Sequence, residues 1–506
     1  MNLNQMMREK ARQYGEKTAV VCDERRLSYA ELDEASNKVA NALLEMGVEK
    51  GDRVSILVPN SMEFIVIFLG ITKIGGISVP LDVKYKFDEL ASLFDNSQPT
   101  VLVAESLYLD PLVPFLPRFE SIEQVIGVGS SYKGQFINYA EIMATGSAQR
   151  VGVEPGPEDI AYIGYTSGPT SHPRGVMLTH ELFLRGSILH ADDFQQTEDD
   201  VLMLFALPMH HVFGLVVALL VSVSRGSKAV ILSGLSLGTL MELIEKEGGT
   251  IFMGVPYVYA LMVKMAEQER ITHDLSSLRL CVSAGASLPD DIDRRFKQQY
   301  GLDIAQLWGL TESTCGVTTG PVGGIKKLGS AGVILPGWEL KIVDDDGREL
   351  PPNQPGEIIV RGLIMKGYFN NPQATDKVIK DGWLHTGDIG KVDEDGYLFV
   401  TGPGKKKGMI IVKGQNIWPS DIEEVLYTHP KIAEAVVVGV PDELRGEIVR
   451  AIISLKEGEV ATEEEIKRFC RERLANYKVP KQVIFADFLP KTATGEIRRG
   501  DLEVIY

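Results

Sequence analysis

Tyr165-Thr-Ser-Gly-Pro-Thr-Ser-His-Pro-Arg-Gly-Val-Met-Leu-Thr-His180 is a loop rich in glycine, serine and threonine, and it follows the short apolar run Ile160-Ala-Tyr-Ile-Gly164. Backbone N–H groups and hydroxyls in such a loop can turn toward a phosphate, while Arg174 supplies a neutralising charge. The loop lacks the Gly-Lys-Ser/Thr of the common GxxxxGK[ST] phosphate loop. We therefore predict a phosphate-binding loop of another kind, with these candidate ligands: Thr166, Ser167, Gly168, Thr170 and Arg174.

The bulk composition limits the function classes. The chain has 506 residues, which is enough for more than one domain and a sizeable core. Its net charge of −17 argues against nonspecific nucleic-acid binding, because such binding needs a basic face. The net negative charge is better explained as a property that keeps the protein soluble.

Cysteine use and hydrophobicity favour a cytoplasmic protein. The four cysteines (Cys22, Cys281, Cys315 and Cys470) are widely spaced and form no CxxC pattern, so a structural zinc site is not expected and a reducing compartment fits. The segment 1–10 has no apolar core of the secretory kind. The most apolar stretch, 201–224, is interrupted by polar residues and proline, and its clean part is too short to span a bilayer.

Outward from the loop, short apolar strands alternate with helices. Residues 28–47 predict a helix, with Ser28 and Glu31 as a capping box and Gly47 at its end. Phe64–Ile74 predicts a buried helix. This alternation predicts a layered α/β architecture with largely parallel sheets. The expected strands are Val54–Val58, Gly76–Val79, Thr100–Ala104, Ala229–Leu232, Thr250–Met253 and Arg279–Val282.

The spacing of glycines and apolar runs changes after about residue 325. Glycines there separate short strands such as Glu339–Val343 and Glu357–Val360, which predicts a small antiparallel, barrel-like subdomain over about 325–402. Thr401–Gly408 is rich in Gly, Pro and Lys and is the candidate hinge. We therefore predict an N-terminal domain over 1–402 and a small, mobile α+β domain over 403–506, in which Pro419 begins a helix.

Three further motifs carry candidate chemistry. Ser283-Ala-Gly-Ala-Ser-Leu-Pro289 is made of small residues, which let a flat base approach the backbone. Trp308-Gly-Leu-Thr-Glu312 ends in a carboxylate, the ligand that a hard cation prefers beside phosphate oxygens. Trp383-Leu-His-Thr-Gly-Asp-Ile389 offers Asp388, and a carboxylate beside a nucleotide commonly accepts hydrogen bonds from ribose hydroxyls.

In this order, and over essentially the whole chain, these motifs resemble those of the adenylate-forming (ANL) superfamily, and in particular the AMP-forming acyl-CoA synthetases. The resemblance implies that a carboxylate attacks the α-phosphate of ATP to give an acyl-adenylate, and that a thiol, usually coenzyme A, then displaces AMP. It implies ATP, Mg²⁺ and coenzyme A as cofactors and a fatty or aryl acid as substrate. It leaves the acyl chain length and a possible homodimer open.

The same resemblance assigns roles to individual residues. Thr311 would contact the α-phosphate and Glu312 would hold Mg²⁺, while Asp388 would bind the ribose. His211, within Ala206-Leu-Pro-Met-His-His-Val-Phe-Gly214, would lie near the substrate carboxylate, whereas His210 fits a plain loop histidine. The remaining members are the adenine-side residues Gly285, Ala286, Ser287 and Gly309, Trp308 beside the adenine or the acyl group, and the thioester-side residues Lys413 and Gly414. The candidate acyl-pocket residues are Val212 to Leu215, Trp308 and Gly309, which suggest an apolar acid.

Three segments depart from the family pattern. In the phosphate loop, Pro169 and Ser171 replace a Thr and a Gly, and Arg174 replaces a Lys. The hinge is longer, with Lys405 as the counterpart of its usual Arg. Near the C-terminus, Glu496 stands where the catalytic Lys of the adenylation step is usual.

Glu496 has the largest expected consequence. Two unit charges about 4 Å apart interact by about 4 kcal/mol at an effective dielectric of about 20. Replacing attraction by repulsion would therefore slow adenylation by on the order of a thousandfold or more. We expect an acyl-CoA synthetase with reduced adenylation; the alternatives are a nucleotide- or acyl-adenylate-binding protein that no longer ligates, and an enzyme specialised for the thioester half.

Overall fold

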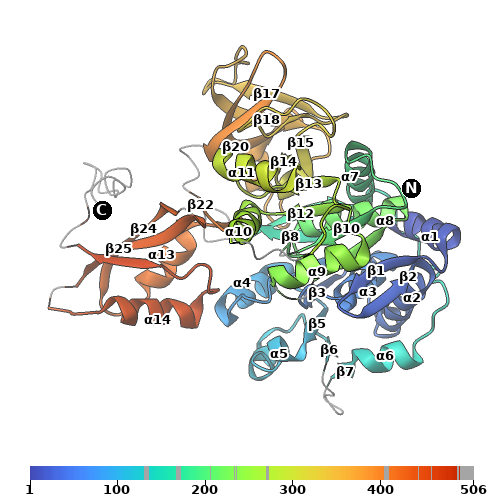
Figure 1. The fold of residues 1–506 in the computed structure, drawn as a ribbon. Coiled ribbons are helices and arrows are strands. Elements are labelled where there is room, and N and C mark those ends of the chain that lie inside the picture. The colour runs from blue at the N-terminus through green and yellow to red at the C-terminus, as the bar shows by residue number, and fades with distance from the viewer. Residues whose placement is uncertain are drawn as a thin grey trace.

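The computed structural model describes residues 1–129, 136–166, 173–205, 207–232, 234, 236–268, 273–403, 409–442, 444–456, 458–486 and 489. Within these residues the chain forms four sheets (Figure 1). Several predicted site residues lie outside the described residues, so their roles stay predictions. They are Ser167, Gly168, Pro169, Thr170, Ser171, Lys405 and Glu496.

The seven-stranded sheet carries the phosphate loop. Its strands are parallel except for the last pair, β8 and β9, which is antiparallel. Thr166 at the end of β8 is paired in register with Arg174 at the start of β9, so the loop connects these two residues. The strand order is β7 (Ile137–Asn138), β6 (Gln124–Val128), β5 (Val101–Glu105), β3 (Arg53–Leu57), β4 (Ile77–Pro80), β8 (Ile160–Thr166) and β9 (Arg174–Thr179).

The nine-stranded sheet carries the other motifs at one edge. Its strands from β14 to β1 are parallel, as the alternation of strands and helices predicted. The motifs at 283–289 and 308–312 come at the carboxyl ends of two neighbouring strands, where ligands of such sheets usually bind. The order is β16 (Val333–Ile334), β15 (Gly316–Thr319), β14 (Ile304–Gly309), β13 (Leu280–Ser283), β12 (Ile251–Gly254), β10 (Val201–Leu204), β11 (Lys228–Ile231), β1 (Thr18–Cys22) and β2 (Arg25–Ser28).

The helices pack on and between these sheets. The predicted capping box of α2 is present, because Ser28 and Glu31 each accept the other's backbone N–H. α3 is buried along nearly all its length, as its uniformly apolar sequence predicted. The helices of the N-terminal region are α1 (Leu3–Tyr14), α2 (Tyr29–Glu45), α3 (Met62–Lys73), α4 (Phe87–Ser97), α5 (Ser106–Leu109), η1 (Val113–Arg118), α6 (Tyr139–Thr145), α7 (His180–Asp193), η2 (Phe213–Leu220), α8 (Val221–Arg225), α9 (Leu237–Glu247), α10 (Pro256–Glu267), α11 (Asp290–Tyr300), η3 (Thr311–Ser313) and α12 (Pro372–Val378).

The apolar stretch 201–224 folds as strand β10, a loop, the π-helix η2 and α8. Seven of the eight residues of η2 are buried, and Leu215–Leu220 belong to the largest core cluster together with side chains from α3 and α7. No helix among the described residues has both the length and the apolar character needed to cross a bilayer. The hydrophobicity of this stretch therefore reflects burial in the protein core.

The predicted antiparallel subdomain is confirmed as a third, five-stranded sheet, the yellow and orange strands of Figure 1. Each of its strand pairs is antiparallel, and β20 carries Asp388. Its strands are β17 (Glu339–Val343), β18 (Gly356–Arg361), β20 (Trp383–Val392), β19 (Ile379–Lys380) and β21 (Leu398–Pro403).

The C-terminal region has its own sheet and its own core. Pro419 is the first residue of α13 (Pro419–Tyr427), as predicted, and Thr462 caps α14 (Glu463–Arg473). Figure 1 shows α14 beside α4 of the N-terminal region. The domain boundary near residue 402 stays a prediction. The strands are β23 (Gln415–Ile417), β22 (Ile410–Val412), β25 (Gly446–Leu455), β24 (Ile432–Asp442) and β26 (Gln482–Phe485).

Candidate active site

Two cavities meet at the edge of the nine-stranded sheet. The larger has a volume of about 650 Å³ and the smaller one of about 190 Å³. We call them the nucleotide cavity and the acyl cavity, after the ligands that the sequence resemblance predicts for their residues. Because they share a wall, ligands in the two cavities would lie within reach of one another. The shared residues are Thr166, Gly285, Leu307, Gly309, Leu310 and Thr311.

The nucleotide cavity brings together motifs that are far apart in the sequence. Gly285, Ala286 and Ser287 form one part of its lining, in the turn that follows β13. On another part, the indole N–H of Trp308 donates to Asp388 Oδ2 at 3.1 Å. A ribose-binding candidate and an adenine-side candidate thus form one connected unit, although their individual roles stay predictions.

Arg174 and Glu312 line the same cavity, and both lie next to Tyr368. The Tyr368 hydroxyl donates to Glu312 Oε1 at 2.8 Å, and the Arg174 guanidinium lies 5.5 Å from the centre of the Tyr368 ring. Burial, and next the Glu312 carboxylate, raise the pKa of Tyr368, so its hydroxyl stays a donor. Among the described residues, the buried Nε of Arg174 has no hydrogen-bond partner. An anionic ligand would supply one.

The donor set fits Mg²⁺ shared with a phosphate. No group of three or more His, Cys, Asp or Glu side chains suited to a metal ion occurs among the described residues. Mg²⁺ is commonly held by one or two carboxylates together with substrate phosphates and water. Glu312 is placed in the cavity to act as that single carboxylate.

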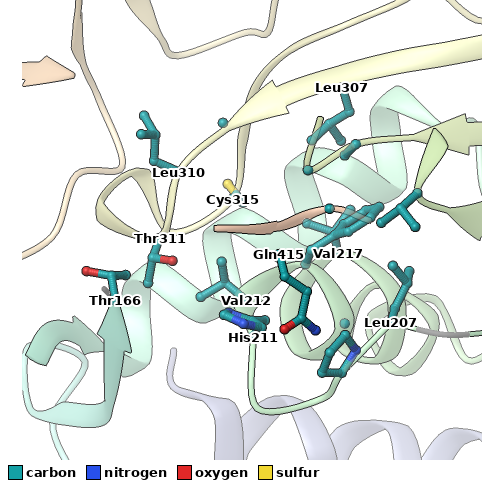
Figure 2. Close-up of a pocket in the computed structure, with 18 of the residues that line it drawn as sticks. Thr166, Leu207, His211, Val212, Val217, Leu307, Leu310, Thr311, Cys315 and Gln415 are labelled. Atoms are coloured by element: carbon teal, nitrogen blue, oxygen red, sulfur yellow. The ribbon is translucent and has the colours of Figure 1, made fainter. Parts of the chain in front are cut away.

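The acyl cavity is largely apolar, with Leu207, Val212, Val217, Leu307 and Cys315 around it (Figure 2). Val212, Phe213, Gly214 and Gly309 line it as expected. Two expected members do not, because Leu215 is fully buried in the core and Trp308 faces the nucleotide cavity.

Close packing shuts one side of the acyl cavity. A Cβ atom on Gly316 would lie 2.7 Å from Cγ of Leu307 and 2.9 Å from the ring of His190. Behind Cys315, a Cβ on Gly186 of α7 would be 3.3 Å from the Cys315 sulfur. Real Cβ atoms need more room than this. The helix α7 therefore closes this side of the cavity.

His211 lies at the cavity as a neutral base. Enclosure by the surrounding protein, and next the neighbouring His210, lower the pKa of His211 to about 3. Its side chain nevertheless stays exposed to the cavity. His210 lies in the adjoining loop, where its backbone carbonyl accepts the Tyr162 hydroxyl at 2.6 Å. These placements agree with a neutral His211 imidazole at the cavity and a structural role for the loop of His210.

The C-terminal region completes the acyl cavity. Gly414 lies in its lining, and its backbone oxygen would be 3.7 Å from a Cβ on Gly285. Lys413 does not line either cavity, and its ammonium group lies 4.4 Å from the centre of the Tyr257 ring.

The sequence reasoning missed several lining residues. Gln415 directly follows the predicted Gly414, so the extended motif could have included it. Tyr477 and Lys478 reach the cavity only because the two regions dock, which no local pattern signals. Among the missed residues are Tyr85, Cys315, Tyr368, Gln415, Tyr477 and Lys478.

Comparison with known families agrees with this geometry. The profile of the family described as AMP-binding enzyme matches residues 7–369, and that of the AMP-binding enzyme C-terminal domain matches residues 421–496. Together they cover most of the chain, including the segment that contains Glu496.

Individual relatives extend over nearly the full length. A long-chain-fatty-acid–CoA ligase of Bacillus subtilis is 32% identical over 530 residues, covering 99% of this chain and 94% of the relative. A 4-coumarate–CoA ligase of Oryza sativa is 35% identical over 494 residues, covering 94% of this chain and 86% of the relative. One similar solved structure is the o-succinylbenzoate CoA synthetase of Bacillus subtilis, as a double mutant bound with its product analogue. It has a TM-score of 0.87 at 29% identity and covers 98% of this chain and 97% of that chain. This chain belongs to the AMP-binding enzyme family, within the adenylate-forming acid–CoA ligases.

Proposed function

We propose that this protein is an AMP-forming acid–CoA ligase that uses ATP to activate a carboxylic acid. The observation that carries the proposal is the shared wall of the two cavities, where Thr166, Gly309 and Thr311 face both. A carboxylate in the acyl cavity would attack the α-phosphorus of ATP in the nucleotide cavity, and pyrophosphate would leave. The sulfur of coenzyme A would then attack the acyl carbon, and AMP would leave.

The nucleotide cavity supports the first step. Asp388 and Arg174 line this cavity. Asp388 would accept hydrogen bonds from the ribose, and Arg174 would bind phosphate oxygens with a planar, permanently charged group. When bound at Glu312, Mg²⁺ would neutralise phosphate charge. Because His211 is neutral, no second cation lies beside the substrate carboxylate. A second cation would stabilise the carboxylate in the ground state and so reduce its reactivity.

The size of the acyl cavity supports a compact acid. An apolar cavity of about 150 Å³ takes up benzene, so one of about 190 Å³ suits a single aromatic ring or a short aliphatic chain. The relatives named above act, by their names, on long-chain fatty acids in one case and on 4-coumarate in the other. The wall formed by Gly316, His190 and α7 favours the aryl or short-chain class.

ATP–pyrophosphate exchange with benzoate, 4-coumarate, hexanoate and palmitate tests both parts of the proposal. Exchange with the aromatic acids or hexanoate, and little with palmitate, is the expected result. Exchange that is strongest with palmitate would overturn the size argument while keeping the ligase. Absence of exchange with all four acids, together with ATP binding, would favour the alternative of a nucleotide-binding protein.

Glu496 favours a second feature, a slow adenylation step. Its carboxylate replaces the lysine that the resemblance expects to bridge the two reacting anions. Acyl-adenylate supplied from outside would then be converted to thioester faster than the complete reaction proceeds. Comparing the rate from synthetic acyl-adenylate with the rate from acid and ATP tests this; equal rates would contradict it.

A further inference from the structure

The C-terminal region docks on the N-terminal region through one buried lysine. Lys478 follows α14, and its Nζ lies 2.7 Å from Glu89 Oε1 and 3.1 Å from Asp421 Oδ2. Only 8% of the Lys478 side chain is exposed. Glu89 belongs to α4 in the N-terminal region, and Asp421 belongs to α13 in the C-terminal region, so the ammonium group bridges the two.

The two carboxylates that pair with Lys478 lie at equivalent positions in their helices. Glu89 and Asp421 each lie in the first turn of a helix, where an acidic side chain is favoured by the helix dipole. Bringing the two helix ends together without a cation would set two negative charges side by side. Burial alone would lower the pKa of Lys478, but Glu89 and Asp421 raise it overall, so the lysine stays charged.

Further contacts across the interface surround this ion pair. The backbone N–H of Ala475 donates to Glu89 Oε2 at 3.0 Å. Lys478 lies 5.4 Å from the centre of the Tyr85 ring, and Lys84 lies 5.8 Å from that of Tyr477, so each region places a lysine over a tyrosine of the other. The contacts are polar and specific, which favours one defined docking orientation.

The docking contacts also allow release. If the regions separate, Lys478 keeps Asp421 within its own region, and Glu89 keeps the backbone N–H of Lys86 that it accepts at 3.0 Å. Neither charge is left without a partner, so opening avoids the usual penalty of a broken buried pair. An interface of this kind can switch between two arrangements.

The docked orientation determines what reaches the acyl cavity. In it, Gly414 packs so closely that an added Cβ would lie 2.8 Å from Val255, and Gln415 lines the cavity (Figure 2). We propose that Lys478, held between Glu89 and Asp421, is a positioning residue that keeps the C-terminal region in the orientation serving the thioester step. This proposal rests on the proposed function for the name of that step.

Glu89→Gln tests the proposal, because it keeps the shape and the acceptor oxygen but removes the charge. Asp88→Asn is the matched control, one residue away on the same helix and exposed. We expect Glu89→Gln to slow thioester formation from preformed acyl-adenylate by about tenfold, in line with the loss of a charged hydrogen bond, and to leave ATP–pyrophosphate exchange unchanged. Equal loss in both half-reactions, or equal behaviour of the two variants, would overturn the proposal.

A distance measurement between the two regions reports their docking independently of catalysis. Dyes on Ser92→Cys in α4 and Arg468→Cys in α14 report the separation, and the four native cysteines are buried and react poorly. Glu89→Gln should shift the population toward longer separations, and Asp88→Asn should not. An unchanged distribution would refute the positioning role. If no acid supports either half-reaction, the proposed function fails, while the distance distribution still decides the role of Lys478.

Discussion

The two cavities are built by different means. The nucleotide cavity is assembled from polar groups on short motifs, such as the Trp308–Asp388 hydrogen bond and the pair of Tyr368 and Glu312. The acyl cavity is assembled from packed apolar side chains and from glycines that leave no room for a Cβ. Changes in the first should therefore alter affinity and rate for any acid, whereas changes in the second should alter which acid is used.

The largest effect is expected at Glu496. Glu496→Lys would replace repulsion of the reacting anions by attraction, so ATP–pyrophosphate exchange should rise by on the order of a thousandfold. The preference among acids should stay the same, since the substitution changes none of the described residues that line the acyl cavity. Glu503→Lys makes the same charge change in the same terminal segment and should have little effect. No gain from Glu496→Lys would refute the idea that this residue limits adenylation.

Asp388 provides the next test, within the nucleotide cavity. Asp388→Asn keeps the size but removes the charge that would accept ribose hydroxyls. A hydrogen bond to a charged group contributes about 1.5–3 kcal/mol, so ATP affinity measured by calorimetry should fall by roughly tenfold to a hundredfold.

Asp395→Asn is the control for this change. Asp395 is an exposed aspartate paired with Lys327, away from the cavity. An equal loss of ATP affinity in both variants, or no loss in either, would show that Asp388 has no specific role in nucleotide binding. A changed ranking of acids in Asp388→Asn would show instead that the two cavities are not independent.

This contrast also explains how far the sequence could predict the molecule. Local patterns determine helix caps such as Ser28 with Glu31, and strands such as β3 and β13, because their causes lie within a few residues. The nucleotide cavity was largely predictable, since each motif carries its chemistry in its own residues. Tyr368 was missed because it lies outside any of these motifs and meets Glu312 only through tertiary folding.

The acyl cavity and the docking interface were less predictable. Cys315 and Val217 look like ordinary core residues in the sequence, and their position at a cavity depends on how η2 and α7 pack. Lys478 and Glu89 are separated by 389 positions in the sequence, and a lone lysine and a lone glutamate are indistinguishable from solvated surface charges before folding. Trp308 was expected beside either the adenine or the acid, and the structure places it in the nucleotide cavity.

The wall of the acyl cavity gives a smaller and more selective effect. Gly316→Ala would place a Cβ 2.7 Å from Leu307, and overpacking of this kind costs about 1–3 kcal/mol. Leu307 must move toward the cavity or the strand must shift, so larger acids should lose kcat/KM more than smaller ones. ATP affinity should stay within about twofold, since Leu307 touches the nucleotide cavity only at the shared wall.

Gly323→Ala is the contrasting glycine substitution, because an added Cβ there meets nothing within 4 Å. Gly323 has a positive φ of 71°, so an alanine there is strained in its backbone. The Gly323→Ala variant therefore measures the cost of a glycine substitution without a packing clash. Equal losses for all acids in Gly316→Ala would show that the wall affects stability and not selection.

The smallest effect concerns His190, which supports that wall from behind. Its Nε2 accepts the backbone N–H of Gly316 at 3.0 Å, and burial lowers its pKa to about 3. An unfolded histidine has a pKa of about 6.5, so below that pH the unfolded chain binds a proton that the folded chain does not. This stability is present at neutral pH and is lost as the pH falls from about 6.5 toward 3. By pH 5.5 the loss should be about 1.4 kcal/mol.

His190→Gln retains an acceptor oxygen for Gly316 but cannot be protonated in this range. Its free energy of unfolding, measured with denaturant at pH 7.5 and 5.5, should therefore depend on pH less steeply than that of the wild type, by about 1.4 kcal/mol over the interval. His273→Gln is the matched control, because His273 lies in an exposed pair with Glu245 and away from the wall. If His190→Gln and the wild type lose stability in parallel, the His190 ring is protonated in the folded state, and the wall behind the acyl cavity is open enough to admit water.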